Sequence, residues 1–226
     1  MATQQRGAAT HKAEAASRRA NGAAQTTRAQ PAPEPPPHSE PPASWFPLLE
    51  KEQMDPEVRA LLEKAEERLG FCPNVFRAWA WRPSRFLKWF AHYNELMTGP
   101  SGLSRANREM IAVVVSMQNK CIYCLTSHGS SLRALTGDPV LADRITLDYR
   151  RAGLEPRERA MLDYALKITR EMEDCSPEDI AALKQHGFSD EDVWDIAEVA
   201  SMFNFTNRLA AATGQMPNRE YHGMAR

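Results

Sequence analysis

Four residues whose types and spacing suit thiol and acid–base chemistry lie close together in the middle of the chain: Glu109, Cys121, Cys124 and His128. Two cysteines in a Cys-x-x-Cys pair at the start of a helix can bring their sulfurs together. The positive end of that helix stabilises a thiolate and lowers the pKa of the thiol. Lys120 adds a positive charge next to the pair. The segment therefore predicts reversible dithiol–disulfide exchange.

His128 and Glu109 are positioned to handle protons for this pair. His128 follows Cys124 by four residues, so a helix places both on one face, and this favours Cys124 as the sulfur that reacts with a substrate. A histidine can take up or return a proton near neutral pH. If the chain turns near Asn119 between antiparallel helices, Glu109 faces His128. A carboxylate in that position orients the ring and stabilises its charged form.

A structural metal site is the main alternative for the same residues. Cys121, Cys124 and His128 could hold zinc with Cys175 or Glu109 as a fourth ligand. Zinc sites of this kind usually combine two ligand pairs, and the second pair is missing here. Alone, Glu109 is typical of a solvated helix face and His128 of a packed or surface histidine. Their joint spacing with the cysteines is what favours a redox site.

The elements that must position these residues are all predicted to be helices. Apolar residues recur at three and four positions, Ser, Asp and Glu stand at helix starts, and Gly and Pro stand at the breaks. No window alternates as a strand does. The fold class is therefore all-α, with helices expected over 55–69, 84–97, 104–118, 121–137, 139–152, 155 to beyond 168, 176–187 and 189–214.

Composition narrows the class of protein. The 226 residues carry a net charge of -1, which argues against a general nucleic-acid binder. The longest apolar stretch, Met110 to Val115, is far shorter than the roughly 20 residues that cross a membrane. Four cysteines and no apolar secretory segment after Met1 predict a cytoplasmic protein. Cys72 and Cys175 are single cysteines, for which buried structural roles are expected.

The chain divides into a tail and one domain. Residues 1–43 are rich in Ala, Arg, Gln, Thr and Pro, and the proline-rich run 31–37 favours extended geometry, so we expect a disordered tail. The first aromatic residue is Trp45, and residues 44–226 form the predicted helical domain. For its aromatic cluster we expect packing in the core or between subunits, ahead of a substrate pocket. The cluster consists of Trp79, Trp81, Trp89 and Phe90.

The four residues and their spacing resemble the alkylhydroperoxidase D-like branch of the carboxymuconolactone decarboxylase family, in its peroxidase-related subgroup. The segment Phe203 to Ala210, followed by Gly214, also resembles that subgroup. The resemblance covers residues 45–222 and implies a compact, homo-oligomeric helical bundle with the Cys-x-x-Cys pair on a helix-turn-helix. It implies reduction of hydroperoxides through a disulfide, which a lipoyl- or thioredoxin-like dithiol donor reduces again, with no cofactor. The family's catalytic residues then correspond to Glu109, Cys121, Cys124 and His128.

One departure from the family stands beside the pair. The best-studied members carry a second histidine just before the second cysteine, where this chain has Tyr123. Tyrosine titrates near pH 10 and is a poor proton shuttle at neutral pH. Decarboxylase-like or ring-opening members do not need the cysteine pair, so its presence counts against their chemistry. A redox sensor that acts through a partner, and the zinc site, remain alternatives.

Overall fold

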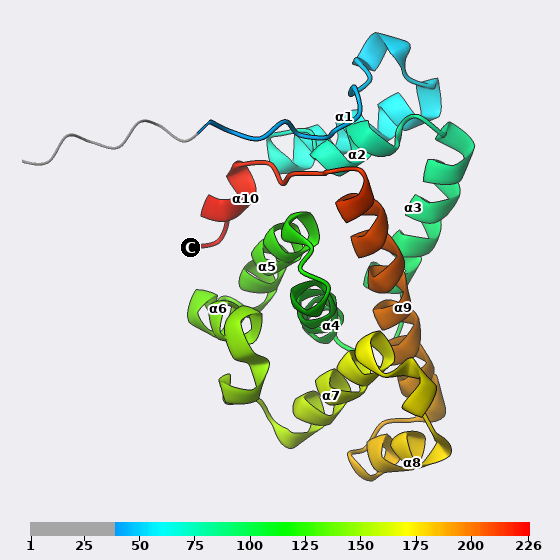
Figure 1. The fold of residues 1–226 in the computed structure, drawn as a ribbon, viewed down its shortest axis with the longest axis vertical. Coiled ribbons are helices and arrows are strands. Elements are labelled where there is room, and N and C mark those ends of the chain that lie inside the picture. The colour runs from blue at the N-terminus through cyan, green and yellow to red at the C-terminus, as the bar shows by residue number, and fades with distance from the viewer. Residues whose placement is uncertain (1–38) are drawn as a thin grey trace, which may run out of the picture. The chain divides into compact units, whose positions relative to one another are not determined.

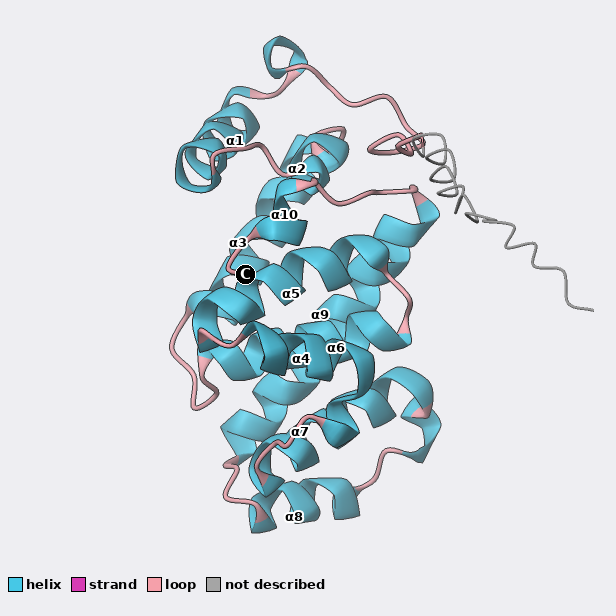
Figure 2. Cartoon of the chain, turned by 90° about the vertical axis from the view of Figure 1, so that its left-hand side faces the viewer, coloured by secondary structure: helices cyan, strands magenta, loops and turns pink. Residues whose placement is uncertain are grey.

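The structure is a computed structural model that describes residues 39–226, and every regular element in that range is a helix (Figures 1 and 2). The predicted all-α class is confirmed. The α-helices are α1 (Pro56–Leu69), α2 (Asn74–Trp79), α3 (Pro83–Thr98), α4 (Arg105–Gln118), α5 (Ile122–Thr136), α6 (Pro139–Asp148), α7 (Pro156–Arg170), α8 (Pro177–Gln185), α9 (Asp190–Ala212) and α10 (Glu220–Gly223). The short 3-10 helices are η1 (Lys51–Gln53), η2 (Tyr149–Arg151) and η3 (Met172–Asp174).

Helix α4 lies at the centre of the bundle, with α5, α6, α7 and α9 around it (Figure 1). Its sequence explains this position, because every residue from Asn107 to Ser116 is buried. A helix that is apolar around most of its circumference must be covered on all sides. The site residues on α4 and α5 therefore rest on the best-packed part of the molecule.

The predicted helix starts correspond to capping side chains. Ser104 and Asn107 form a reciprocal capping box at the start of α4, and Asp138 accepts the first backbone N–H groups of α6, directly before Pro139. Helix α6 was expected to reach residue 152 but ends at Asp148. The Asp148 side chain accepts the Arg150 N–H at 3.1 Å, which favours the tight turn of η2 instead.

Two short helices, α2 and α10, were not predicted. Each is too short to show helical periodicity, and asparagine side chains join the start of α2 to the segment just before α10. The Asn74 N–H donates to Asn218 Oδ1 at 2.8 Å, and Asn74 Nδ2 donates to the Met216 carbonyl at 3.0 Å. The Asn218 amide in turn donates to the Cys72 carbonyl. Long-range contacts of this kind join segments 142 to 146 residues apart, which a sequence pattern cannot reveal.

Most of the predicted tail, residues 1–38, lies outside the described residues. Within the described part, residues 43–45 run beside the end of α9. Met216 donates its N–H to the Ala43 carbonyl, and the Trp45 N–H donates to the Thr213 carbonyl. In residues 39–226, no helix has the length and apolar character needed to cross a membrane.

Candidate active site

The turn between α4 and α5 places the cysteine pair. Lys120 takes a left-handed conformation with φ of 54°, and the Cys121 N–H donates back to the Ser116 carbonyl at 3.0 Å. Helix α5 therefore returns along α4, as the antiparallel arrangement predicted near Asn119 requires. Asn119 Nδ2 donates to the side-chain oxygens of Asn204 and Asn207 on α9, both at 3.0 Å. These bonds tie the turn to a third helix.

Cys121 is the residue that caps the start of α5, and it is 3% exposed. Its Sγ accepts the Cys124 N–H at 3.5 Å. A hydrogen bond from the Cys124 side chain is the main cause that lowers the pKa of the Cys121 thiol from 9.0 to about 7. The backbone N–H groups of Cys124 and Tyr123 and the charge of His128 act in the same direction, whereas burial opposes them. Of the two thiols, that of Cys121 is therefore the one that ionises more readily.

Cys124 is the partner that keeps its proton. Its hydrogen bond to Cys121 and its burial both raise the pKa of its thiol well above 9.0. Hydrogen bonds from Asn207 and Thr206 on α9 lower the pKa of Cys124 by less. Asn207 is itself held in place, since its Nδ2 donates to the buried Ser116 Oγ at 3.0 Å. The sequence analysis named the segment Phe203 to Ala210 only as part of the resemblance, and it did not place Asn207 or Thr206 beside the cysteine pair.

Glu109 and His128 form the predicted pair across the two helices. Glu109 Oε2 lies 2.7 Å from His128 Nδ1, and the side chains are 12% and 13% exposed. The ring of Phe203 meets the imidazole edge-on at a centroid distance of 4.6 Å, and Tyr93 lies at 6.2 Å. Because Nδ1 is engaged by the carboxylate, the other ring nitrogen, Nε2, is left for proton exchange with a substrate or a sulfur.

A cavity of about 220 Å³ opens onto this group and contains Glu109, Cys124 and His128 in its lining. We call it the aromatic cavity, because eight Phe, Trp and Tyr rings line it: Phe76, Trp79, Trp89, Phe90, Tyr93, Tyr123, Phe203 and Tyr221. Trp79, Trp89 and Phe90, three of the four clustered aromatics for which the sequence favoured packing, therefore line this cavity as well as packing in the core. The fourth, Trp81, is exposed and donates its indole N–H to the Pro47 carbonyl at 2.9 Å. An aromatic lining suits an organic molecule with an apolar body.

A second cavity of about 200 Å³ contains Cys121 and does not contain Cys124. We call it the rear cavity. Its lining is formed by the turn before α5, the end of α9 and the first described residues of the chain: Pro41, Pro42, Trp45, Lys120, Cys121, Ile122, Ala210, Ala211, Gly214, Gln215 and Met216. Only Ala210 and Gln215 border both cavities. The two sulfurs of the pair thus face two different spaces.

Tyr123, which occupies the place of the family's second histidine, is held away from proton transfer by its own contacts. Its hydroxyl accepts the Val75 N–H at 3.3 Å. Burial and the neighbouring Tyr221 raise the pKa of this phenol well above 10.0. The residue therefore links α5 to α2 and α10 and keeps its proton at neutral pH.

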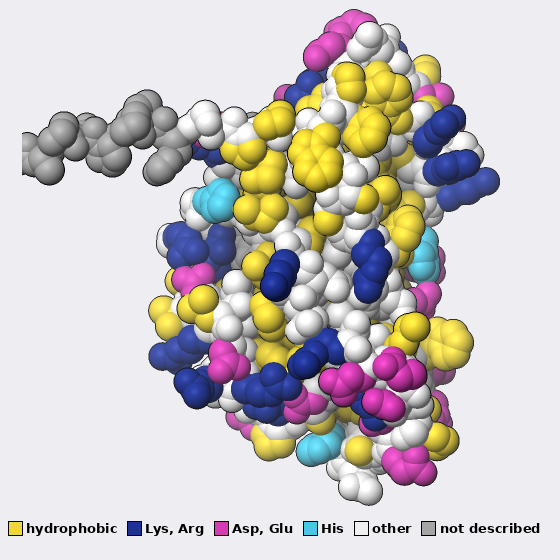
Figure 3. All heavy atoms as spheres, viewed as in Figure 1, with side chains coloured by type: hydrophobic (Ala, Val, Ile, Leu, Met, Phe, Trp, Pro, Cys, Tyr) yellow, Lys and Arg dark blue, Asp and Glu magenta, His cyan; other side chains and the backbone are white. Residues whose placement is uncertain are grey.

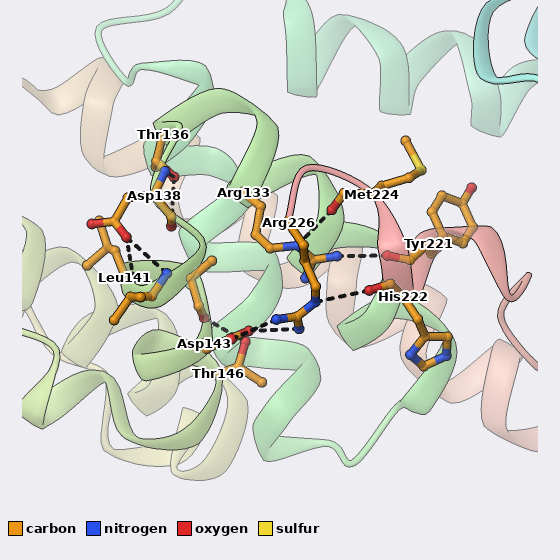
Figure 4. Close-up of polar contacts among 12 residues, drawn as sticks. Arg133, Thr136, Asp138, Leu141, Asp143, Thr146, Tyr221, His222, Met224 and Arg226 are labelled. Atoms are coloured by element: carbon orange, nitrogen blue, oxygen red, sulfur yellow. Dashed lines mark hydrogen bonds and ion pairs between the residues drawn. The ribbon is translucent and has the colours of Figure 1, made fainter.

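The C-terminal segment covers one side of the aromatic cavity, to which Tyr221 and Met224 both contribute. Arg133, 5% exposed on α5, holds this segment by its backbone (Figure 4). Its guanidinium donates to the Met224 carbonyl at 2.9 Å and to the Tyr221 carbonyl at 2.7 Å. Arg226 adds a two-pronged ion pair to Asp143 on α6, at 3.0 and 3.1 Å.

The remaining candidates from the sequence lie outside this group. In residues 39–226, no three His, Cys, Asp or Glu side chains are placed to hold a metal ion together. Cys175 stands before α8, where burial and the Asp179 carboxylate raise the pKa of its thiol. Burial and Glu66 likewise raise the pKa of the half-buried Cys72 thiol. Both thiols are less ionised than the Cys121 thiol at neutral pH.

Comparison with known proteins agrees with this architecture. The model of the carboxymuconolactone decarboxylase family matches residues 84–139, which span α3 to the end of α5. The solved structure of a peroxidase-related protein from Ralstonia eutropha JMP134, described as an alkylhydroperoxidase AhpD core, is 39% identical, with a TM-score of 0.80. The alignment covers 83% of this chain and 98% of that one.

A second solved structure, a peroxidase-related protein from Silicibacter sp. TM1040, is 46% identical, with a TM-score of 0.77, over 81% of this chain and 96% of the other. This chain belongs to the alkylhydroperoxidase D-like branch of the carboxymuconolactone decarboxylase family. It falls in the peroxidase-related subgroup. YdfG of Bacillus subtilis (strain 168), an uncharacterized protein, is 25% identical over 121 residues, 53% of this chain and 82% of its own length. The family is named after carboxymuconolactone decarboxylase and the branch after alkylhydroperoxidase D, which are both enzymes. This chain therefore belongs to a family of enzymes.

Proposed function

We propose that this protein is a thiol-dependent peroxidase that reduces organic hydroperoxides through a disulfide between Cys121 and Cys124. The observation that carries the proposal is the aromatic cavity, in which Cys124 and His128 share one wall while Glu109 holds the histidine at 2.7 Å. A substrate in this cavity meets a sulfur, a proton donor and an apolar surface together. The subgroup's peroxidase-related members, with which this chain shares its fold, support the same chemistry.

The first step oxidises Cys124. Its Sγ attacks the outer oxygen of the hydroperoxide, and the Cys121 thiolate takes up its proton. The O–O bond breaks, and the departing alkoxide receives a proton from His128, whose charge Glu109 supports. The products of this step are an alcohol and a sulfenic acid on Cys124. General acid–base assistance is needed here because an alkoxide is a poor leaving group at neutral pH.

The second step closes the disulfide. Cys121 Sγ attacks Cys124 Sγ, the S–O bond breaks, and the hydroxide leaves as water with the proton of Cys121. The spacing of the pair across the first turn of α5 makes this attack intramolecular and fast. A dithiol donor of the lipoyl or thioredoxin-like type then reduces the disulfide. Its two protons restore the thiol of Cys124 and the charge of His128, so that atoms and electrons balance over the cycle.

We also propose that the protein is a cytoplasmic homo-oligomer, and an apolar patch supports the homo-oligomer. Apolar side chains gather on the end of the molecule that carries α2 (Figure 3). Large exposed aromatic residues near α2 are Phe46, Trp81 and Phe205. The Trp81 indole N–H donates to the carbonyl of Pro47, the residue after Phe46. The Phe205 ring meets the Trp79 ring edge-on, with the ring centroids 6.1 Å apart. Large exposed aromatic side chains commonly pack between identical subunits. Light scattering that shows a monomer at micromolar concentration would contradict the proposed homo-oligomer.

The experiment that tests the proposal follows the oxidation of the reduced protein by cumene hydroperoxide. Free thiols are counted over time, and the new disulfide is mapped by mass spectrometry. We expect two thiols to be lost per chain and the link to join Cys121 and Cys124. The single variants Cys72→Ser and Cys175→Ser serve as matched controls and keep the reaction. Cys121→Ser lacks the thiolate that takes up the proton of Cys124, so oxidation should be slower in this variant, and the sulfenic acid should remain on Cys124, where dimedone traps it.

Two outcomes contradict the proposal. One is a reduced protein that loses no thiols to any organic hydroperoxide at a rate above that of a free thiol in solution. The other is an oxidised link at Cys72 or Cys175. Continuous turnover in the presence of dihydrolipoamide and hydroperoxide then distinguishes an enzyme from a redox sensor, which is oxidised once per chain.

A further inference from the structure

The two sulfurs of the pair face separate spaces: Cys124 lines the aromatic cavity, and Cys121 lines the rear cavity. We propose that the electron donor enters through the rear cavity and attacks Cys121, while the hydroperoxide enters through the aromatic cavity and oxidises Cys124. The donor that fits is a dithiol on a slender aliphatic chain. This inference rests on the proposed peroxidase function and deepens it, because it assigns each half of the cycle to its own entrance.

The size and lining of the rear cavity select this donor. Cys121 is only 3% exposed, so its sulfur does not stand out on the surface, and the rear cavity is the space that it borders. A folded protein presents the sulfur of its Cys-x-x-Cys pair on a broad surface, which does not fit into a space of about 200 Å³. An aliphatic chain does, and the walls contributed by Trp45, Ile122 and Ala211 are apolar. Lys120, exposed at the edge, attracts a donor in its reactive thiolate form.

An unsatisfied polar atom gives a second, independent sign of a ligand. Gln215 is 3% exposed, and its side-chain amide nitrogen is satisfied, because Nε2 donates to Thr213 Oγ1 at 2.9 Å. Its Oε1 is buried without a hydrogen-bond partner among the described residues. A buried acceptor without a partner costs about 1–3 kcal/mol. Gln215 borders both cavities beside the cysteine pair, where a donor's N–H or S–H group can satisfy this oxygen.

The exchange proceeds in two balanced steps. A donor thiolate attacks Cys121 Sγ, the Cys121–Cys124 bond breaks, and Cys124 leaves with the electron pair and then takes up a proton. The second donor thiolate then attacks the donor's own sulfur in the mixed disulfide, so the donor is oxidised to its cyclic disulfide and Cys121 leaves as a thiolate.

The electrostatics of the pair favour this order. The main cause that raises the pKa of Cys124 is its bond to the Cys121 sulfur, which is absent while Cys121 is linked to the donor. The bonds from Asn207 and Thr206 then stabilise the departing Cys124 thiolate. In the second step the leaving group is Cys121, whose pKa is lowered to about 7. A thiol of lower pKa leaves faster in disulfide exchange.

Trapping shows which sulfur the donor attacks. The oxidised full-length protein is mixed with a monothiol that has the chain of dihydrolipoamide but lacks its second sulfur. The reaction is quenched with acid, and the mixed disulfide is mapped by mass spectrometry. We expect the monothiol on Cys121. Its presence on Cys124 would overturn the inference.

Narrowing the rear cavity tests the entrance. Ala211 and Ala212 are neighbouring exposed residues near the end of α9, but only Ala211 lines the rear cavity. Oxidation by cumene hydroperoxide and reduction by dihydrolipoamide are measured as separate half-reactions. We expect Ala211→Trp to lower the ratio of reduction rate to oxidation rate by about tenfold, and Ala212→Trp to leave this ratio as in the parent. Equal ratios in both variants would refute the entrance, as would faster reduction by thioredoxin than by dihydrolipoamide.

The two half-reactions also distinguish the failure of this inference from the failure of the proposed function. If the reduced protein is not oxidised by hydroperoxide at all, the peroxidase proposal fails. If oxidation is normal and the trapped donor is found on Cys124, only the assignment of the entrances fails.

Discussion

Glu109 Oε2 lies 2.7 Å from His128 Nδ1, across two helices joined by a tight turn, and both side chains are mostly buried. A buried carboxylate with a hydrogen-bonded histidine keeps the ring in one orientation and supports its positive charge. The ring is further confined by Phe203, which meets it edge-on. In the mechanism that we propose, this pair transfers a proton to a substrate in the aromatic cavity.

Replacing either member of the pair should slow oxidation of the cysteines. We expect Glu109→Gln and His128→Ala each to slow disulfide formation by at least about tenfold, below the roughly 100- to 10,000-fold that acid–base assistance commonly contributes. The double variant should be little slower than either single one, because residues acting as a unit are not additive. Stopped-flow measurement of thiol loss with cumene hydroperoxide gives the rates.

A matched control for this pair exists on the surface. His92 Nε2 lies 3.5 Å from Glu198 Oε1, and both side chains are well exposed. Glu198→Gln and His92→Ala should leave the oxidation rate unchanged. If Glu109→Gln reacts at the parent rate across about pH 6 to 8, Glu109 is a packing residue, and helix α5 alone activates the pair.

The sequence was sufficient to predict the pairing of Glu109 with His128. Both lie at a known distance from one turn, and helical periodicity then determines which faces meet. The helix starts were predictable for a similar reason, since a cap such as Ser104 acts within its own first turn.

The environment of each sulfur was not predictable from the sequence. Thr206 and Asn207 reach Cys124 from α9, more than eighty residues along the chain, and Arg133 holds carbonyl groups that carry no side-chain signature. Such contacts depend on how helices pack in space, which no local pattern contains. The same holds for the aromatic cluster, whose residues serve the core and the cavity together.

The lowered pKa of Cys121 predicts a specific dependence on pH. Because the pKa of this thiol is about 7 in the fold and 9.0 for the ordinary group, the thiolate stabilises the reduced fold fully above pH 9.0, and this stabilisation is lost as the pH falls through about 7. The melting temperature of the reduced protein should therefore rise relative to that of Cys121→Ser between about pH 6 and about pH 9. The ultraviolet absorbance of thiolate should show a transition near pH 7 that Cys121→Ser lacks. If the melting temperatures of the parent and of Cys121→Ser changed with pH in parallel, the thiolate would belong to another residue.

Tyr123→Phe tests whether this phenol replaces the family's second histidine. The variant leaves the Val75 N–H without its acceptor, so we expect a loss of about 1 kcal/mol in the free energy of unfolding, measured by urea denaturation. The pH dependence of cysteine oxidation between about pH 6 and 8 should keep its shape, because Tyr123 holds its proton throughout this range. A changed pH profile would instead assign Tyr123 a part in proton transfer.

Arg133→Met should release the C-terminal segment from the aromatic cavity. The methionine keeps much of the apolar volume of the arginine stem but removes both hydrogen bonds to the carbonyl groups of Met224 and Tyr221, which are then left without this donor. The surface pair of Arg226 with Asp143 is worth about 0–1 kcal/mol and should not hold the segment alone. Since Tyr221 and Met224 form part of the cavity wall, we expect faster proteolysis after residue 218 and a KM for cumene hydroperoxide raised more strongly than kcat is lowered.

Arg144→Met, at an exposed position on the neighbouring helix α6, is the matched control and should change neither the rate of proteolysis nor the KM. If Arg133→Met shows parent-like proteolysis and KM, the segment is held by packing of the Tyr221 ring against Phe71, which meet edge-on at 4.9 Å, and Arg133 adds nothing to the wall of the cavity.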